Sequence, residues 1–85
     1  MNDSKIYKKI EAIMINQGLI KKDDVIDREA DLFEVYSINS IKAIQLLVEL
    51  ENNFDIIFEE DALLPYNYRN INTLIETIKR HLNKG

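Results

Sequence analysis

The chain has 85 residues, a formal net charge of -4, 46% apolar residues and no cysteine. This length allows one small domain, and we expect residues 1–85 to form a single one. The lack of cysteine excludes disulfide bonds, a thiolate nucleophile and a cysteine-based zinc site. The lysine and arginine residues are scattered, so no basic stripe is available to bind a nucleic acid.

The apolar residues fall in short groups rather than in a membrane-length run, which predicts no insertion into a membrane. The first segment, Met1 to Lys9, is polar and charged, and it lacks the apolar core of a secretory signal. We therefore expect a cytoplasmic protein, and we expect it to be a monomer.

The first predicted helix runs from Ser4 to Gln17. Its apolar residues recur at intervals of three and four residues, which is the helical spacing: Ile6, Ile10, Ile13 and Met14. Asp3 or Ser4 is suited to cap its start, and Gly18 is placed to end it. The following residues, Leu19 to Ile38, show no sustained period and predict a long ordered loop. One short turn is possible within that loop, at Leu32, Phe33 and Tyr36.

The clearest helix is predicted from Ser40 to Asn53. It carries a core-facing stripe at helical spacing: Ala43, Leu46, Leu47, Leu50 and Phe54. Residues 54–58 resemble a strand, but no other segment offers a partner strand, so we expect an extended loop. Glu59 to Leu64 then predicts one short helix that Pro65 ends, and Asn70 caps a last amphipathic helix. The result is an all-α four-helix bundle with three long helices, one short helix and a long first loop.

Two short motifs stand at the ends of the second predicted helix: Ser37-Ile38-Asn39-Ser40-Ile41 at its start, and Leu-Glu-Asn-Asn-Phe, residues 50–54, at its end. They resemble the Gly-x-Asp-Ser-Leu and Leu-Glu-x-x-Phe motifs of the acyl and peptidyl carrier protein family. Residues 68–74 are similar to the family's Phe-x-Thr-Ile-x-x-Leu before the final helix. The resemblance spans about Ile6 to Leu82, and it implies the acyl-carrier fold.

The resemblance also implies that Ser40 carries covalent 4′-phosphopantetheine, moved from coenzyme A by a phosphopantetheinyl transferase. The reactive thiol then belongs to this cofactor, so we expect no catalytic residue and no enzyme activity. The positive end of a helix independently suits a phosphodiester at this position. Further partners would be acyl- or aminoacyl-loading enzymes and downstream synthases. Lys42 and Gln45 occupy positions that are usually acidic in fatty-acid carriers, which favours specialised lipid, polyketide or nonribosomal peptide biosynthesis.

Two positions depart from the family motif: Asn39 replaces the usual Asp, and Ser37 replaces the usual Gly. The first change removes a charge that can pair with a basic residue of the transferase. Asparagine still has the short polar side chain of a good N-cap, so the helix should start normally. We expect Asn39 and Ile41 to take part in recognition by the transferase.

Three aliphatic residues beside Ser40 are predicted to lie on the exposed shoulder of the second helix: Ile41, Ile44 and Val48. This patch would receive partner enzymes, with Glu49 and Glu51 adding charges at its rim. Aliphatic residues at this spacing can instead widen the core stripe.

Two other functions stay open. An interaction module that is never modified is favoured by Asn39, and Ser40 would then be an ordinary first-turn serine. An enzyme acting through its own side chains needs a nucleophile and a base that converge, and the sequence contains no such motif.

His81, the single histidine, is predicted to lie at the surface near the end of the last helix. The acidic clusters lack the glycine and spaced oxygen ligands of a calcium loop, so we expect no metal site.

Overall fold

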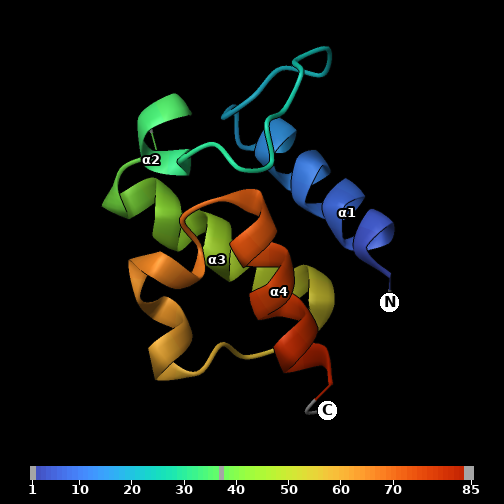
Figure 1. Ribbon diagram of the computed structural model, residues 1–85, viewed down its shortest axis with the longest axis vertical. Helices are drawn as coiled ribbons and strands as arrows, with labels where there is room; N and C mark the ends of the chain where they lie inside the picture. Colours follow the sequence, from blue (N-terminus) through green and yellow to red (C-terminus); the bar gives the residue numbers. More distant parts are fainter. Residues whose placement is uncertain (1, 37, 84–85) are drawn as a thin grey trace.

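The computed structural model describes residues 2–36 and 38–83, and within these ranges it is helical and has no strand. The elements in chain order are α1 (Asp3–Asn16), α2 (Leu32–Val35), α3 (Ser40–Phe54), η1 (Glu60–Leu63), η2 (Pro65–Asn67) and α4 (Ile71–Leu82) (Figure 1). The prediction of an all-α bundle with three long helices is confirmed. Ser37, one of the two motif departures, lies outside the described residues.

Both ends of α1 are fixed by local hydrogen bonds. The Oδ1 atom of Asn2 accepts the backbone N–H of Lys5 at 2.9 Å, so the predicted cap at Asp3 or Ser4 was wrong by one or two positions. The predicted end is confirmed, because Gly18 has a φ of 76° and backbone bonds from the residues after the helix close its last turn. Glycine takes this left-handed conformation without steric cost.

The connection between α3 and α4 differs from the single short helix that was predicted. Two successive 3₁₀ turns, η1 and η2, occupy it. Pro65 begins the second turn, because the first residue of a helix does not need the backbone N–H that proline lacks. Residues 54–58 do not pair as a strand, as predicted, but the predicted loop begins later, because Phe54 still belongs to α3 and Asp55 ends the helix with a φ of 54°.

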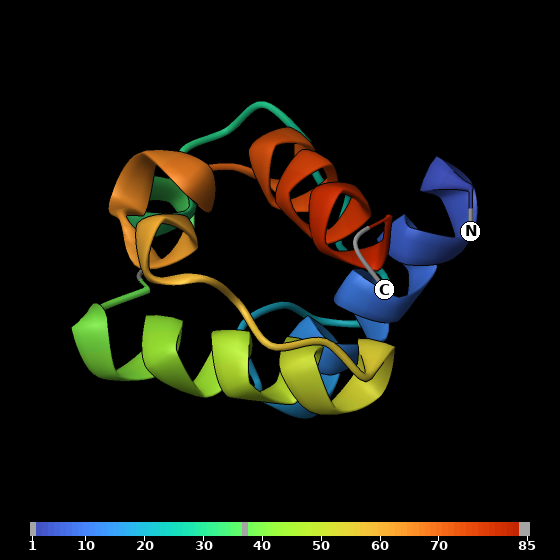
Figure 2. The ribbon, with the colours of Figure 1, turned by 90° about the horizontal axis from the view of Figure 1, so that it is seen from below.

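The core lies between the three long helices, since α1 packs against both α3 and α4. Ile10, Leu50 and Leu74, one from each helix, are fully buried. The predicted core stripe of α3 is buried in full. Figure 2 shows α3 along one side of the molecule, with η1 and η2 facing its first half. None of the helices within residues 2–36 and 38–83 is long and apolar enough to cross a bilayer.

Candidate functional site

Ser40 is the first residue of α3, and its side chain is exposed. The preceding residue, Asn39, has an extended backbone, and its Oδ1 atom accepts the backbone N–H of Lys42 at 2.9 Å. The predicted N-cap at Asn39 is therefore confirmed. Because Asn39 caps the helix, the hydroxyl of Ser40 is not needed for this role.

The surroundings of Ser40 fit a covalently attached phosphodiester. The first backbone N–H groups of a helix have no partner within the helix, and the helix dipole makes this end positive. The first turn of α3 contains no acidic side chain that would repel a phosphate. A 4′-phosphopantetheine group would thus be joined to Ser40 Oγ, with its phosphate near the amides of this first turn.

A cavity of about 530 Å³ begins at Ser40 and follows α3. One face of the helix forms its floor, because residues spaced by three and four positions lie above one another: Ser40, Ile44, Leu47, Val48 and Glu51. The opposite wall comes from four different segments: Phe33, Phe58, Leu63 and Tyr68. The lining is mostly aliphatic and aromatic, so the cavity can hold an apolar chain.

The three predicted docking residues lie on the exposed shoulder of α3, as expected, and not in the core. Ile41, Ile44 and Val48 are 69%, 62% and 46% exposed. Ile44 and Val48 also line the cavity, whereas Ile41 does not. The structure therefore brings Ile44 and Val48 together with Ser40, and their role in docking stays a prediction.

Glu51 was predicted to add a charge at the rim of the docking patch, but the structure gives it a different position. Its Oε2 atom accepts the backbone N–H of Phe58 at 2.9 Å, and its side chain is half-buried at the cavity. This bond fixes the loop after α3 so that Phe58 faces the cavity. Glu49 is exposed, as a rim residue would be.

His81 is also placed differently from the surface position that was predicted, because it is only 6% exposed. Its Nδ1–H donates to the carbonyl oxygen of Thr77 at 2.8 Å, and its Nε2 atom accepts the backbone N–H of Glu59 at 3.0 Å. Its ring also meets the ring of Phe58 edge to face, with centroids 5.2 Å apart. These contacts join α4 to the loop that carries Phe58, so the histidine helps to fix the position of Phe58 in the cavity wall.

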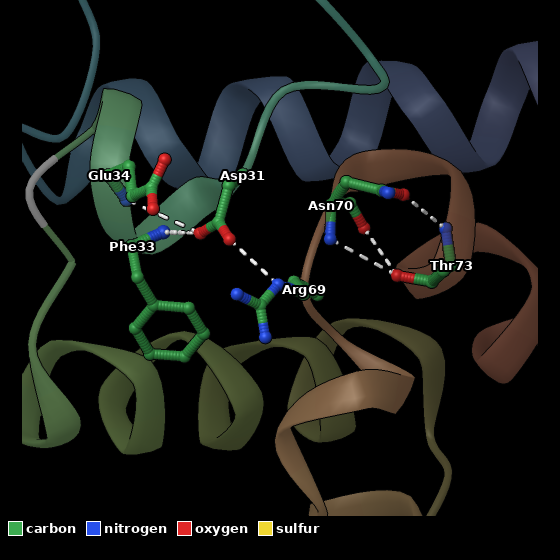
Figure 3. A network of polar contacts seen from close by, with 6 residues as sticks. All are labelled: Asp31, Phe33, Glu34, Arg69, Asn70 and Thr73. Carbon is green, nitrogen blue, oxygen red and sulfur yellow. Dashed lines mark hydrogen bonds and ion pairs between the residues drawn. The ribbon is translucent and has the colours of Figure 1, made fainter.

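The segments that carry Phe33 and Tyr68 are joined by an ion pair (Figure 3). Arg69 Nε donates to Asp31 Oδ2 at 2.7 Å, while Asp31 Oδ1 accepts the backbone N–H groups of Phe33 and Glu34 at the start of α2. Partial desolvation acts to raise the pKa of Asp31, but the two backbone bonds and the Arg69 guanidinium together hold this pKa below its ordinary value.

Sequence reasoning missed the four residues of the opposite wall as parts of the site. Phe33, Phe58, Leu63 and Tyr68 come from α2, the loop after α3, η1 and the segment after η2. A helical stripe can be read from local spacing, whereas this wall is assembled from separate short segments. The available signal was the presence of three large aromatic side chains in segments without a core-facing period.

Within residues 2–36 and 38–83, no group of three or more His, Asp or Glu side chains is placed to hold a metal ion.

Comparison with known proteins agrees with this arrangement. Residues 14–78 match the family described as "Phosphopantetheine attachment site". The chain is 30% identical over 77 residues to "Acyl carrier protein" of Phytoplasma mali (strain AT), which covers 91% of this chain and 88% of that protein. No solved structure matches the chain. The chain belongs to the acyl carrier protein family, whose members are not enzymes but carriers of acyl intermediates on covalently attached 4′-phosphopantetheine.

Proposed function

We propose that this chain is a free-standing, single-domain carrier in which Ser40 is the attachment site and the cavity along α3 holds the apolar part of the cargo. The observation that carries this proposal is that one exposed serine stands both at the N-terminus of a capped helix and at the rim of an apolar cavity.

The roles of the chain's own residues follow from their positions. In the modification, the hydroxyl oxygen of Ser40 would attack the pyrophosphate of coenzyme A and gain the phosphopantetheinyl group, while the pyrophosphate bond breaks and adenosine 3′,5′-bisphosphate and the hydroxyl proton leave. The attached group supplies the thiol that carries an acyl thioester. Ile44, Leu47 and Val48 give the cavity an apolar floor on which a hydrocarbon chain is removed from water. Such burial would stabilise the loaded protein and protect the cargo from solvent.

Partner recognition would use the exposed shoulder of α3. Asn39 and Ile41 lie next to Ser40 and would contact the phosphopantetheinyl transferase. Ile44 and Val48 would then form the apolar centre of the surface that receives loading enzymes and downstream synthases.

The charge of the surface near Ser40 also supports one class of pathway over another. Lys42 and Gln45 are exposed and not acidic, so the steering of strongly basic partners would be weak near Ser40. This favours a specialised lipid, polyketide or nonribosomal peptide pathway, operating in the cytoplasm.

The test is the intact mass of the protein after incubation with coenzyme A, magnesium and a broad-specificity phosphopantetheinyl transferase. We expect a gain of one phosphopantetheinyl group, and no gain in Ser40→Ala. Circular dichroism of Ser40→Ala checks that the fold is kept, which is expected because Asn39 supplies the cap.

The second candidate is an interaction module that is never modified, and the observation in its favour is Asn39 in place of the usual acid. It predicts an unchanged mass with every transferase, including one from the same organism. It also predicts that Ser40→Ala leaves the protein's cellular function intact, whereas a carrier loses its function.

A further inference from the structure

The geometry points to Phe33 and Tyr68 as specificity-determining residues in the wall of the cavity that Ser40 also lines, and to the Asp31–Arg69 ion pair as the bond that holds them in place. The cargo favoured by this arrangement is an unbranched apolar chain rather than a bulky group close to the attachment point. This inference rests on the proposed cargo role of the cavity, and it adds which residues limit the shape of that cargo.

The first observation is the contact between the two rings. The centroids of Phe33 and Tyr68 lie 5.8 Å apart with the ring planes tilted by 47°, which is a favourable distance for an aromatic pair. Both residues line the cavity that begins at Ser40. In Figure 3 the ring of Phe33 points from α2 towards α3. The pair therefore forms a continuous part of the wall that faces the helix carrying Ser40.

The second observation is that hydrogen bonds join the segment that carries Phe33 to the segment that carries Tyr68. Asp31, two residues before Phe33, accepts from Arg69, which directly follows Tyr68. The backbone N–H of Leu32 also donates to the carbonyl oxygen of Arg69 at 2.8 Å. The ion pair therefore joins the two segments beside the rings, and breaking it should loosen the wall without removing either ring.

Few charged side chains line the cavity itself, which leaves shape as the main basis of selection. Nine of the described residues line the cavity, and among these nine only Glu51 is charged, with its carboxylate already bonded to the backbone of Phe58. An apolar wall discriminates between apolar groups through steric fit, since an oversized group either stays in water or forces the rings apart.

The experiment attaches cargo mimics at residue 40 without any transferase. Ser40→Cys creates a single thiol, because the chain has no cysteine of its own. This thiol is labelled to completion with n-hexyl or cyclohexyl methanethiosulfonate, two groups with six carbons and different shapes. The melting temperature of each labelled protein is compared with that of the methyl-labelled protein in four backgrounds: unchanged, Phe33→Ala, Tyr68→Ala and the control Tyr66→Ala.

We expect the n-hexyl group to raise the melting temperature by about 4 °C or more in the unchanged background, and the cyclohexyl group to give less than half of that rise. In Phe33→Ala and Tyr68→Ala the cyclohexyl group should stabilise as much as the hexyl group. Tyr66 is 64% exposed and does not line this cavity, so Tyr66→Ala should keep the original difference. Phe33→Leu and Tyr68→Leu replace any alanine variant that does not fold.

The ion pair is tested by Asp31→Asn in the same assay. Asparagine keeps the Oδ1 atom that accepts from α2, but its amide nitrogen cannot accept from Arg69. We expect the difference in melting temperature between the hexyl-labelled and cyclohexyl-labelled proteins to become smaller. Arg69→Gln should reduce this difference by the same amount, and the double variant should show no further reduction. Lys79→Gln, which breaks the distant ion pair with Asp3, is the matched control and should leave the difference intact.

The inference is overturned if the hexyl group gives no stabilisation, or if the two groups stabilise the unchanged background equally. It is also overturned if Phe33 and Tyr68 variants show the same difference as Tyr66→Ala. The assay needs neither a transferase nor coenzyme A, so its outcome is independent of whether Ser40 is modified. A failure of the proposed function would instead appear as an unchanged mass in the transferase experiment.

Discussion

At the scale of single residues, His81 shows how one polar side chain can be buried without loss of stability. Both ring nitrogens have partners, one on α4 and one on the loop before η1. His81→Ala should lower the free energy of unfolding by about 2 kcal/mol, because it opens a small cavity and removes the acceptor used by the Glu59 N–H. Urea denaturation measures this loss.

The neighbouring Arg80 gives the control for His81. It is exposed, so Arg80→Ala should change the free energy of unfolding by no more than about 0.5 kcal/mol. Equal effects of the two substitutions would contradict the structural role of His81.

Two substitutions of Asn39 distinguish its role as a helix cap from its proposed role in recognition by the transferase. Asn39→Ala should lose about 1 kcal/mol of stability because the N–H of Lys42 loses its side-chain acceptor. Asn39→Asp keeps the acceptor, so its stability should equal or exceed that of the natural chain. If a charge at this position aids the transferase, Asn39→Asp should also raise the rate of modification in a mass-based time course. An unchanged rate would remove Asn39 from the proposed recognition surface.

At the scale of elements, α2 has only four residues and depends on Asp31, both as its cap and as its tie to the segment before α4. Because the pKa of Asp31 is lowered in the folded chain, its ionised form contributes stability above the ordinary pKa of about 4. That contribution is lost as the pH falls through the folded-state pKa. Asp31→Asn should therefore be less stable than the natural chain at neutral pH, and the gap should close on acidification.

Thermal unfolding of both proteins between about pH 3 and pH 7 measures this gap, with the window set by the ordinary aspartate pKa. Other carboxylates titrate in both proteins, so the difference isolates Asp31. A gap that does not change with pH would mean that the charge of Asp31 contributes nothing.

The elements also show what can be predicted from the sequence. The long helices followed from their spacing, and the buried stripe of α3 was predicted residue by residue because periodicity reports which face is covered. The cap at Asn39 and the exposed shoulder of α3 also followed from capping preference and helical spacing, whereas the role of Ser40 comes from the family motif and stays a prediction. The wall of the cavity and the burial of His81 did not, because they depend on contacts between segments that are 22 to 38 residues apart in the chain.

At the scale of the whole molecule, cargo and stability should be linked. An acyl chain that can enter the cavity only when the protein is folded must stabilise the folded state. The form of the protein that carries an acyl group should therefore melt at a higher temperature than the form that carries the free thiol, and more so for longer unbranched chains, until the cavity is filled. Differential scanning calorimetry of the two forms tests this, and equal melting temperatures would exclude burial of the cargo.

The cavity has two sides of unequal construction. Its floor belongs to one continuous helix of 15 residues, whereas the opposite wall belongs to a four-residue helix, one 3₁₀ turn and two loop segments. Short elements have few internal hydrogen bonds to break, so this wall should open by local unfolding while the long helices remain intact. Its backbone amides should then exchange with solvent deuterium much faster than those of α3, which means that an unbranched apolar chain can enter and leave while the bundle stays folded.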